Sequence, residues 1–226
     1  MAIFTLQDVR DGKLFVPEIV LPSYVAGTSA SFASSSASMS TPSGMLEGDL
    51  LILSGGHTGT GTAAWGYTDY SGDGWSSLHT QRTTFTNWIG YNVMGASPLA
   101  SISPPNWAPS STINGELVMA AFRNAGTPVI TTASVSTSGT TTSPAVTTTV
   151  DGSVVVIGVF IDEERTLTPP AGYTTIAMQT GFGYMGTSGL AYKVIDTAGT
   201  ETPGAWSWSA GAEDSQAFSI VIPPAA

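Results

Sequence analysis

The sequence contains no cysteine, which excludes disulfide bonds, thiolate zinc sites and cysteine nucleophiles. It is also poor in positive charge. Six Lys and Arg residues among 226 leave a net charge of −10, so no basic patch could neutralise a phosphate backbone, and we expect no nucleic-acid partner. Charged residues make up only 10% of the chain and hydrophobic residues 42%, a composition typical of a folded domain rather than a disordered one.

A long hydrophobic run is also missing from the N-terminal stretch MAIFTLQDVRDGKLF, which contains acidic residues instead. Secretory signals have a continuous apolar segment after a basic one, and membrane-spanning helices need about 20 apolar residues. We therefore expect neither a secretory signal here nor insertion into a membrane.

Helical periodicity is nearly absent. Short runs rich in Val, Ile, Thr and aromatic residues stand between clusters of Gly, Pro, Ser and Asn, which is the pattern of strands joined by turns. The expected strands are 18–21, 30–39, 49–54, 87–93, 116–122, 146–149, 153–160, 174–179, 188–194 and 215–222. So many short strands predict an all-β sandwich or barrel. The runs LLIL and VVVIGVF do not alternate with polar residues, which predicts burial on both faces.

Four segments recur in the same order about 100 residues apart. EGDLLILSGG (47–56) is echoed by VDGSVVVIGV (150–159), DGWSSLHTQ (73–81) by AGYTTIAMQ (171–179), WIGYNV (88–93) by GLAYKV (189–194), and LVMAAF (117–122) by AFSIVI (217–222). Repeated order at a fixed period indicates repeated structural units. We predict a jelly-roll-like β-sandwich domain over 27–226, built from related halves at about 27–126 and 127–226 that share one core.

Residues 1–26 lie outside this repeat and contain the extended apolar segment LFVPEIVLPSY. Its prolines cannot donate to a sheet ladder, which favours an edge strand or unpaired chain. An exposed apolar arm needs something to pack on. We consider two readings: an ordinary edge strand, or an arm that contacts a neighbouring subunit through Phe15, Val16, Ile19, Val20 and Leu21.

The ordered motifs GDLLIL (48–53), PPAGYTTI (169–176), LAYKVID (190–196) and GTETPGAWSWS (199–209) resemble a β module of phage virion structural proteins, in which GDLLL, GW and YKV patterns follow one another. The resemblance covers roughly residues 28–222 and rests on residues typical of cores and turns. It implies a jelly-roll-type sandwich in a fibre, spike or capsid decoration subunit, and it supplies no catalytic motif.

The resemblance implies a non-enzymatic protein of the virion, made in the host cytoplasm, that acts in assembly and in host attachment. Its expected partners are further copies of itself, with a trimer favoured, other virion proteins and a host surface glycan. We expect no cofactor and no metal. The alternative is a carbohydrate-binding module or adhesin that acts by itself.

Residues capable of catalysis are few. His57 and His79 are the only histidines and no metal or hydrolase motif accompanies them. Asp162, Glu163 and Glu164 could supply the paired carboxylates of a glycan hydrolase, but neighbours on an extended chain point to opposite faces, so a solvated hairpin tip is the favoured reading.

The stretch TDYSGDGW (68–75) matches the first half of a calcium loop through Asp69, Ser71 and Asp73. However, the twelfth position of such a loop falls on Thr80 rather than on an acid. The equivalent stretch TPPAGYTT (168–175) has no carboxylate but keeps the glycine before an aromatic residue. A glycine turn leading into an aromatic strand is therefore the favoured interpretation.

Four aromatic residues, Trp65, Tyr67, Tyr70 and Trp75, cluster within eleven positions of this glycine-rich region. Exposed Trp and Tyr are typical of sugar-stacking platforms and protein hot spots, because they bring a large area at low entropic cost. The competing interpretation is that they pack back over one end of the sandwich. They are the ligand-binding candidates of the sequence.

If these aromatics bind a glycan, the sugar should quench tryptophan fluorescence, and Trp65→Ala or Trp75→Ala should abolish the response. Titration with a panel of bacterial surface glycans would measure it. Quenching that persists in both variants would assign the signal to another tryptophan.

Overall fold

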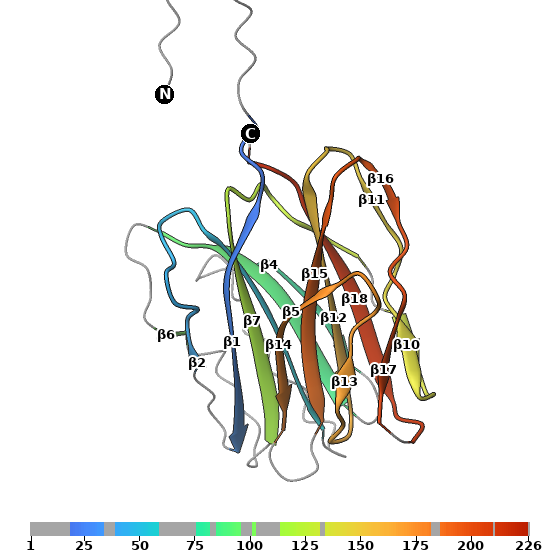
Figure 1. Ribbon diagram of the computed structural model, residues 1–226. Coiled ribbons are helices and arrows are strands. Elements are labelled where there is room, and N and C mark those ends of the chain that lie inside the picture. Colours follow the sequence, from blue (N-terminus) through green and yellow to red (C-terminus); the bar gives the residue numbers. More distant parts are fainter. Residues whose placement is uncertain are drawn as a thin grey trace, which may run out of the picture.

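The computed structural model describes residues 19–33, 39–58, 76–81, 85–95, 101–102, 114–131, 134–181, 186–209 and 211–225. Every regular element in these ranges is a strand, so the all-β prediction is confirmed. Figure 1 shows two large antiparallel sheets, one formed by the blue to green strands and the other by the yellow to red ones.

The first large sheet has the strand order β1-β7-β3-β5-β4. Its strands are β1 (Ser23–Ala33), β3 (Leu50–Thr58), β4 (Ser76–Gln81), β5 (Phe85–Val93) and β7 (Asn114–Arg123). Strand β3 lies at the centre, where Leu50 to Leu53 are at most 2% exposed. The unalternating LLIL run is thus buried on both faces, as predicted.

The second large sheet has the order β14-β15-β12-β18-β8, and β9 also pairs with β18. Its strands are β8 (Val129–Ile130), β9 (Ser134–Ser136), β12 (Ser153–Ile161), β14 (Thr174–Thr180), β15 (Thr187–Ile195) and β18 (Ser215–Ile222). Every residue of β12 is buried, which confirms the two-sided burial predicted from VVVIGVF.

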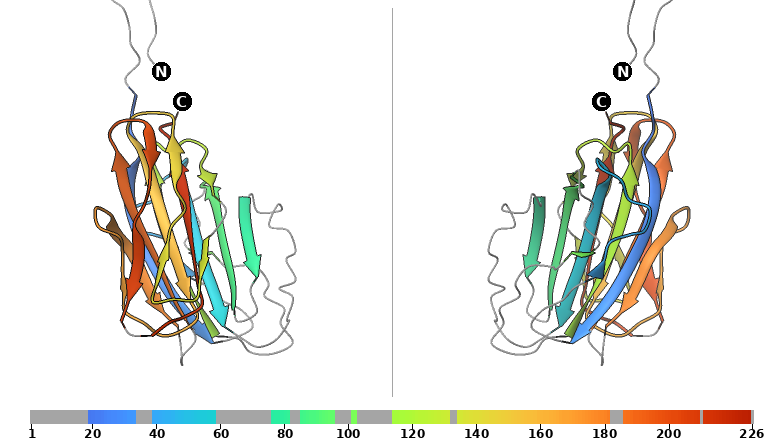
Figure 2. Two further views of the ribbon diagram at one scale, coloured as in Figure 1. Left: turned by 90° about the vertical axis from the view of Figure 1, so that its right-hand side faces the viewer. Right: turned by 90° about the vertical axis from the view of Figure 1, so that its left-hand side faces the viewer.

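Shorter strands flank the large sheets. One three-stranded sheet has the order β10-β17-β13, one pair joins β11 to β16, and another joins β2 to β6. Their bounds are β2 (Met39–Ser40), β6 (Ser101–Ile102), β10 (Thr140–Thr142), β11 (Val146–Thr148), β13 (Leu167–Thr168), β16 (Gly199–Glu201) and β17 (Ala205–Trp208). In Figure 2 the large sheets are seen nearly edge-on as two layers, with the green strand β4 at the outer edge of one of them.

The two large sheets have matching strand orders. The first sheet has the order β1-β7-β3-β5-β4, and the second, read from its other edge, has the order β8-β18-β12-β15-β14, with β9 beside β8 on β18. When β8 and β9 are taken together, in both sheets the first strand along the chain is at one edge, the last strand is next to it, and the second strand is at the centre. The register also agrees: Leu50 lies opposite Val93 and Phe122, and Val154 lies opposite Val194 and Ile222. This register matches Leu50 with Val154. The sequence comparison of EGDLLILSGG with VDGSVVVIGV matches Leu50 with Ser153, so that alignment is wrong by one residue.

Three clusters of buried apolar side chains account for the core. One lies between the second large sheet and the short strands outside it, where Trp206 is fully buried. Another lies on the outer face of the first large sheet and includes Met39 of β2. The third, the central interface, joins the inner faces of the two large sheets. Its buried members are Leu50, Ile52, Ile89, Val118, Ala120, Phe122, Val154, Val156, Leu190, Phe218, Ile220 and Ile222.

The strand boundaries differ from the sequence expectation mainly near the N-terminus. Residues 19–22 are not in a strand, whereas β1 begins at Ser23, so residues 23–26 of the expected arm belong to the first large sheet. Pro22 explains the start, because it cannot donate a ladder hydrogen bond.

Glycine at 56 allows the two large sheets to approach closely. A β-carbon placed on Gly56 of β3 would lie 2.1 Å from Phe160 Cδ2 of β12 in the facing sheet. We expect Gly56→Ala to destabilise the fold by about 1–3 kcal/mol, because the Phe160 ring must move within a packed interface. Gly199→Ala is the control, since no atom lies within 4 Å of a β-carbon there. Urea unfolding would measure both, and equal small effects would contradict the close approach.

Candidate functional site: an apolar terminal surface

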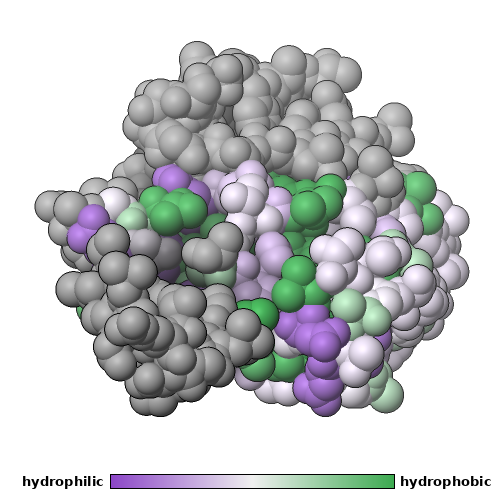
Figure 3. All heavy atoms as spheres, turned by 90° about the horizontal axis from the view of Figure 1, so that it is seen from above, coloured by the Kyte–Doolittle hydropathy of each residue, from purple (hydrophilic) through white to green (hydrophobic). Residues whose placement is uncertain are grey.

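Exposed apolar side chains gather at one end of the sandwich. Seven large apolar side chains there are each 43 to 62% exposed. Some precede β1 and one lies in the turn before β3. The others lie at or near the ends of β5, β8 and β15, and the strand pairing places these ends at the same end of their sheets. The seven are Ile19, Val20, Leu21, Leu46, Val93, Val129 and Val194. We call this set the terminal surface. It is the upper end in Figure 1, where both ends of the described chain lie, and Figure 3 shows green apolar groups across it.

An ion pair between a buried carboxylate and a partly exposed arginine holds the turn that carries Leu46. Asp49 is 1% exposed, and Arg123 donates to it through Nε at 3.0 Å and Nη2 at 2.8 Å. The same carboxylate accepts a hydrogen bond from the Leu46 N–H at 2.8 Å, and Arg123 Nη2 also donates to the Gly44 carbonyl at 2.9 Å. Such two-point contacts with a carboxylate fix geometry, so this pair defines the shape of the surface around Leu46.

Two glycine turns support the surface from below, one in each large sheet. Gly48 and Gly152 both have positive φ and come directly before the buried strands β3 and β12. The Gly48 N–H donates to the Met94 carbonyl, and the Gly152 N–H to the Ile195 carbonyl, each at 2.8 Å. A β-carbon on Gly152 would lie 2.3 Å from Leu21 Cδ2, so the chain before β1 packs on this turn.

Aromatic rings connect the two sheets near the terminal surface. The rings of Tyr24 in β1 and Tyr192 in β15 stack with centroids 5.1 Å apart, and Phe122 of β7 meets both at about 6 Å. Burial, and secondarily the nearby Tyr192, raises the pKa of the Tyr24 hydroxyl. Aromatic pairs at these separations add stability beyond the area they bury. This end of the central interface is therefore held by rings.

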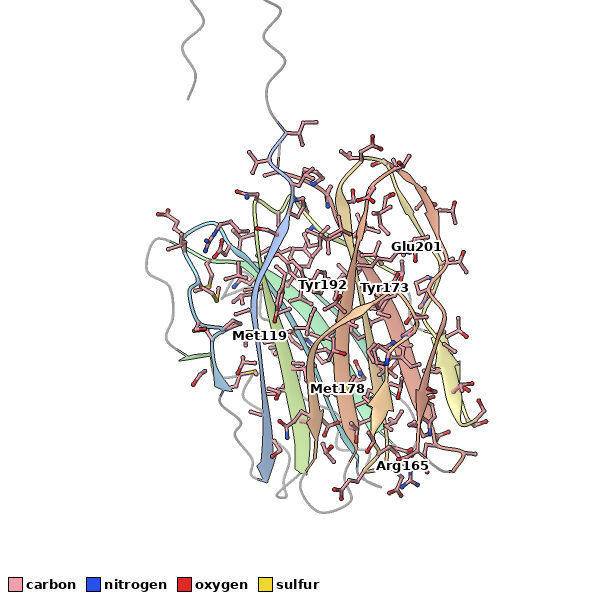
Figure 4. All side chains as sticks on the ribbon, viewed as in Figure 1. Met119, Arg165, Tyr173, Met178, Tyr192 and Glu201 are labelled. Carbon is pink, nitrogen blue, oxygen red and sulfur yellow. The ribbon has the colours of Figure 1, made fainter. Side chains whose placement is uncertain are left out.

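The motif residues of the second half form a hydrogen-bonded group on the second sheet. Lys193 Nζ donates to both carboxylate oxygens of Glu201 at 3.0 Å, and the Tyr173 hydroxyl donates to Glu201 Oε1 at 3.1 Å. Figure 4 labels Tyr173 and Glu201 on their neighbouring segments. Burial, and then the carboxylate, raises the pKa of Tyr173 far above its usual value. These three side chains are hydrogen-bonded to one another. They therefore have a structural role, which is to connect β15, β16 and the start of β14.

Acidic groups gather at the opposite end of the second sheet. The Asp162 N–H donates to the Asp214 carbonyl at 3.1 Å, and the neighbouring Arg165 pairs with Glu213. Figure 4 shows Arg165 at the lower end of the sandwich. Burial, and then the charge of Asp214, raises the pKa of the Asp162 carboxyl to about 6. The structure thus adds Asp214 and Glu213 to the expected set of Asp162, Glu163 and Glu164, in a bend between β12 and β13.

Several candidates from sequence lie outside the described residues: Trp65, Tyr67, Tyr70 and Trp75, the calcium-loop residues Asp69 and Asp73, and Phe15 and Val16 of the arm. Ile19, Val20 and Leu21 are described and belong to the terminal surface. His57 and His79 lie on β3 and β4, which β5 separates. Among the described side chains no group of three or more His, Cys, Asp or Glu could hold a metal ion.

Sequence reasoning did not identify Leu46, Val93, Val129 or Val194 as surface residues. Val93 and Val194 end the YNV and YKV motifs. The signal that could have found them is their place in a turn or at or next to a strand end, beside polar turn residues.

Scans against models of protein families, against curated proteins and against solved structures returned no match for this chain. In the part of the chain that the structure describes, no helix is long and apolar enough to span a membrane.

The Asp49–Arg123 pair makes a direct prediction. Arg123→Met would leave the buried carboxylate without its cation, so we expect unfolding at a lower denaturant concentration than in the wild type. Arg123→Lys keeps the charge but not the two-point geometry, and should lower the midpoint by less. Chemical unfolding near neutral pH would measure both variants. A smaller decrease for Arg123→Met than for Arg123→Lys would rule out the pair as the support of the turn.

Proposed function

We propose that this protein is a non-enzymatic structural subunit of a bacteriophage particle, of the capsid decoration, head spike or tail fibre type. It assembles with further copies of itself and with other virion proteins through the terminal surface. The observation that carries the proposal is the gathering of seven exposed apolar side chains at the end of the sandwich where the chain enters and leaves. Exposed apolar patches on soluble proteins are typical of interaction sites.

The partner at this surface is a second copy of the same chain. The candidate arm residues Ile19, Val20 and Leu21 are part of the surface, and eighteen further residues precede them, including the apolar pair Phe15 and Val16. An apolar arm that starts on an apolar surface provides a self-complementary contact, since the arm of one copy fits the surface of the next. The resemblance to phage modules favours a trimer.

The finer description of the fold supports the same reading. We propose that each half is a jelly-roll-like unit. In the second half the large sheet is matched by the small sheet β10-β17-β13, and in the first half the pair β2-β6 occupies the place of β10-β17 in strand order. Two sheets that share a few crossing connections are the architecture of jelly rolls, which are common in viral capsid proteins. Related halves explain the recurring motifs.

Host attachment belongs to the aromatic-rich segment 59–75. This segment joins β3, which ends at Thr58, to β4, which begins at Ser76 opposite Tyr91. A glycan is the expected ligand, because Trp and Tyr side chains stack on sugar rings.

Charge added to the terminal surface should separate the copies. We expect the wild-type protein to sediment as an oligomer at micromolar concentration, and the double variant Val93→Asp, Val194→Asp to sediment as a monomer, because burying two carboxylates in an apolar contact is costly. Val135→Asp is the matched control: Val135 is 54% exposed, close to the 53% of Val93, but lies on β9 at the other end.

Dissociation by Val135→Asp as well would place the contact elsewhere, and a wild-type monomer would contradict self-assembly. Electron microscopy of purified particles would then test location. Density for the protein on the particle, with the terminal surface toward it, is the expected result. Absence from particles would overturn the virion assignment and leave the adhesin reading.

A further inference from the structure

Polar side chains occupy the lower end of the central interface, in two rows that face each other. In the first sheet Asn87 and Glu116 lie on either side of Gly56, and in the second sheet Ser188 and Gln216 lie on either side of Phe160. The Phe160 ring occupies the space above Gly56, which brings the rows together. All four polar residues are between 0 and 4% exposed.

Glu116 is the one acid in these rows. It is fully buried, and its Oε1 accepts a hydrogen bond of 3.4 Å from the Ser188 hydroxyl in the facing sheet. Its Oε2 has no hydrogen-bond partner among the described residues. By the strand matching given above, the counterpart of Glu116 in the second sheet is Gln216, a neutral side chain of nearly the same shape. The interface therefore accepts a neutral group at one of the two positions and an ionisable group at the other.

We propose that Glu116 is a proton-dependent latch between the two large sheets. With the carboxyl group protonated, the lower end of the central interface is closed. When the group ionises, a charge that has no cation partner among the described residues is placed between the sheets, and the lower end loosens while the ring-packed upper end stays closed. This inference does not depend on the proposed virion role.

In the part of the chain that the structure describes, no positively charged group offsets the ionisation of Glu116. The facing described residues on β3, β5, β15, β12 and β18 are neutral: Ser54, Gly56, Asn87, Ser188, Phe160 and Gln216. Ser31 of β1 is its neighbour on the same sheet. Beyond the strand ends the nearest set contains Asp162, Glu163, Glu213 and Asp214, with Arg165 bound to Glu213.

Burial raises the pKa of Glu116 well above its usual value, and the Ser188 hydrogen bond opposes this only in part. A carboxyl group that stays protonated in the folded chain but ionises in the unfolded chain binds more protons when folded. Stability is therefore greatest below the unfolded value of about 4.3 and falls as pH rises towards the folded-state pKa. The Asp162 carboxyl, with its pKa of about 6, contributes the same sign over a lower range.

The test compares the wild-type chain with Glu116→Gln, which gives position 116 the residue type found at 216. Urea unfolding at several pH values from about 6.5 to 9 would avoid most of the Asp162 contribution. For the wild type we expect the unfolding equilibrium constant to rise by up to tenfold per pH unit until Glu116 ionises. For Glu116→Gln we expect this rise to disappear. Glu164→Gln, at an exposed carboxylate, is the matched control and should keep the wild-type slope.

A wild-type slope in Glu116→Gln would overturn the proposal. Should that variant fail to fold, the wild-type protein provides two readouts. Carbon-13 NMR of the Glu116 side chain should report a protonated carboxyl at neutral pH, and titration near pH 4 would overturn the latch. Hydrogen-exchange protection should fall with pH at the amides of Glu116 and Ser188 before it falls at Tyr24 and Tyr192, whereas equal loss at both ends would also overturn it.

Discussion

The packing of the two large sheets against each other is the constraint on which the rest of the structure depends. Strands β3 and β12 are buried on both faces, so neither sheet could remain in water by itself without exposing Leu50, Ile52, Val154 and Val156. Each fully buried side chain of this size contributes about 1.5–3 kcal/mol. The short outer strands cover only one face of each sheet, and the inner faces can be covered only by each other. The terminal surface and the polar rows are the two ends of this single contact.

Glycine and aromatic residues make the contact close. Phe160 fills the space that Gly56 leaves in the facing sheet, and Phe218 fills the space above Gly158 on the neighbouring strand. Where the first sheet has a glycine the second has a ring, since Gly56 corresponds to Phe160 in the matched register. Matching strand orders therefore do not produce a symmetric interface. The two large sheets are complementary at this point, since the glycine of one receives the ring of the other.

Much of this fold could be predicted from the sequence, because the physical signals were local. Unalternating runs such as LLIL predicted two-sided burial, and the glycine before an aromatic residue predicted the turn at Gly172, where φ is +86°. The alignment of the two halves was wrong by one residue in the apolar runs, because a stretch such as VVVIGV contains no landmark of its own. The landmarks are the left-handed glycines 48 and 152, which sequence cannot distinguish from other glycines.

The surface and the buried acid were harder to predict for a related reason. Val93 and Val154 have the same side chain, yet Val93 ends β5 and is half-exposed, whereas Val154 lies on the central strand β12 and is fully buried. Likewise Glu116 stands in NGELVMAAF, where an acid just before an apolar run is typical of a solvated strand end. It is buried because the other large sheet covers it, and Ser188 of that sheet, which donates a hydrogen bond to it, lies 72 residues away in sequence.

The two ends of the central interface differ in what holds them, and this difference has a mechanical consequence. Near the terminal surface, stacked rings and buried aliphatic side chains lose little when the pH or the ionic strength changes, because apolar packing does not depend on charge. At the other end, the interface contains buried polar groups with few hydrogen-bond partners among the described residues. In such a low-dielectric interior, the gain or loss of one proton changes the stability of the interface. A subunit anchored by the apolar end would therefore keep its attachment while the remote end responds to its surroundings.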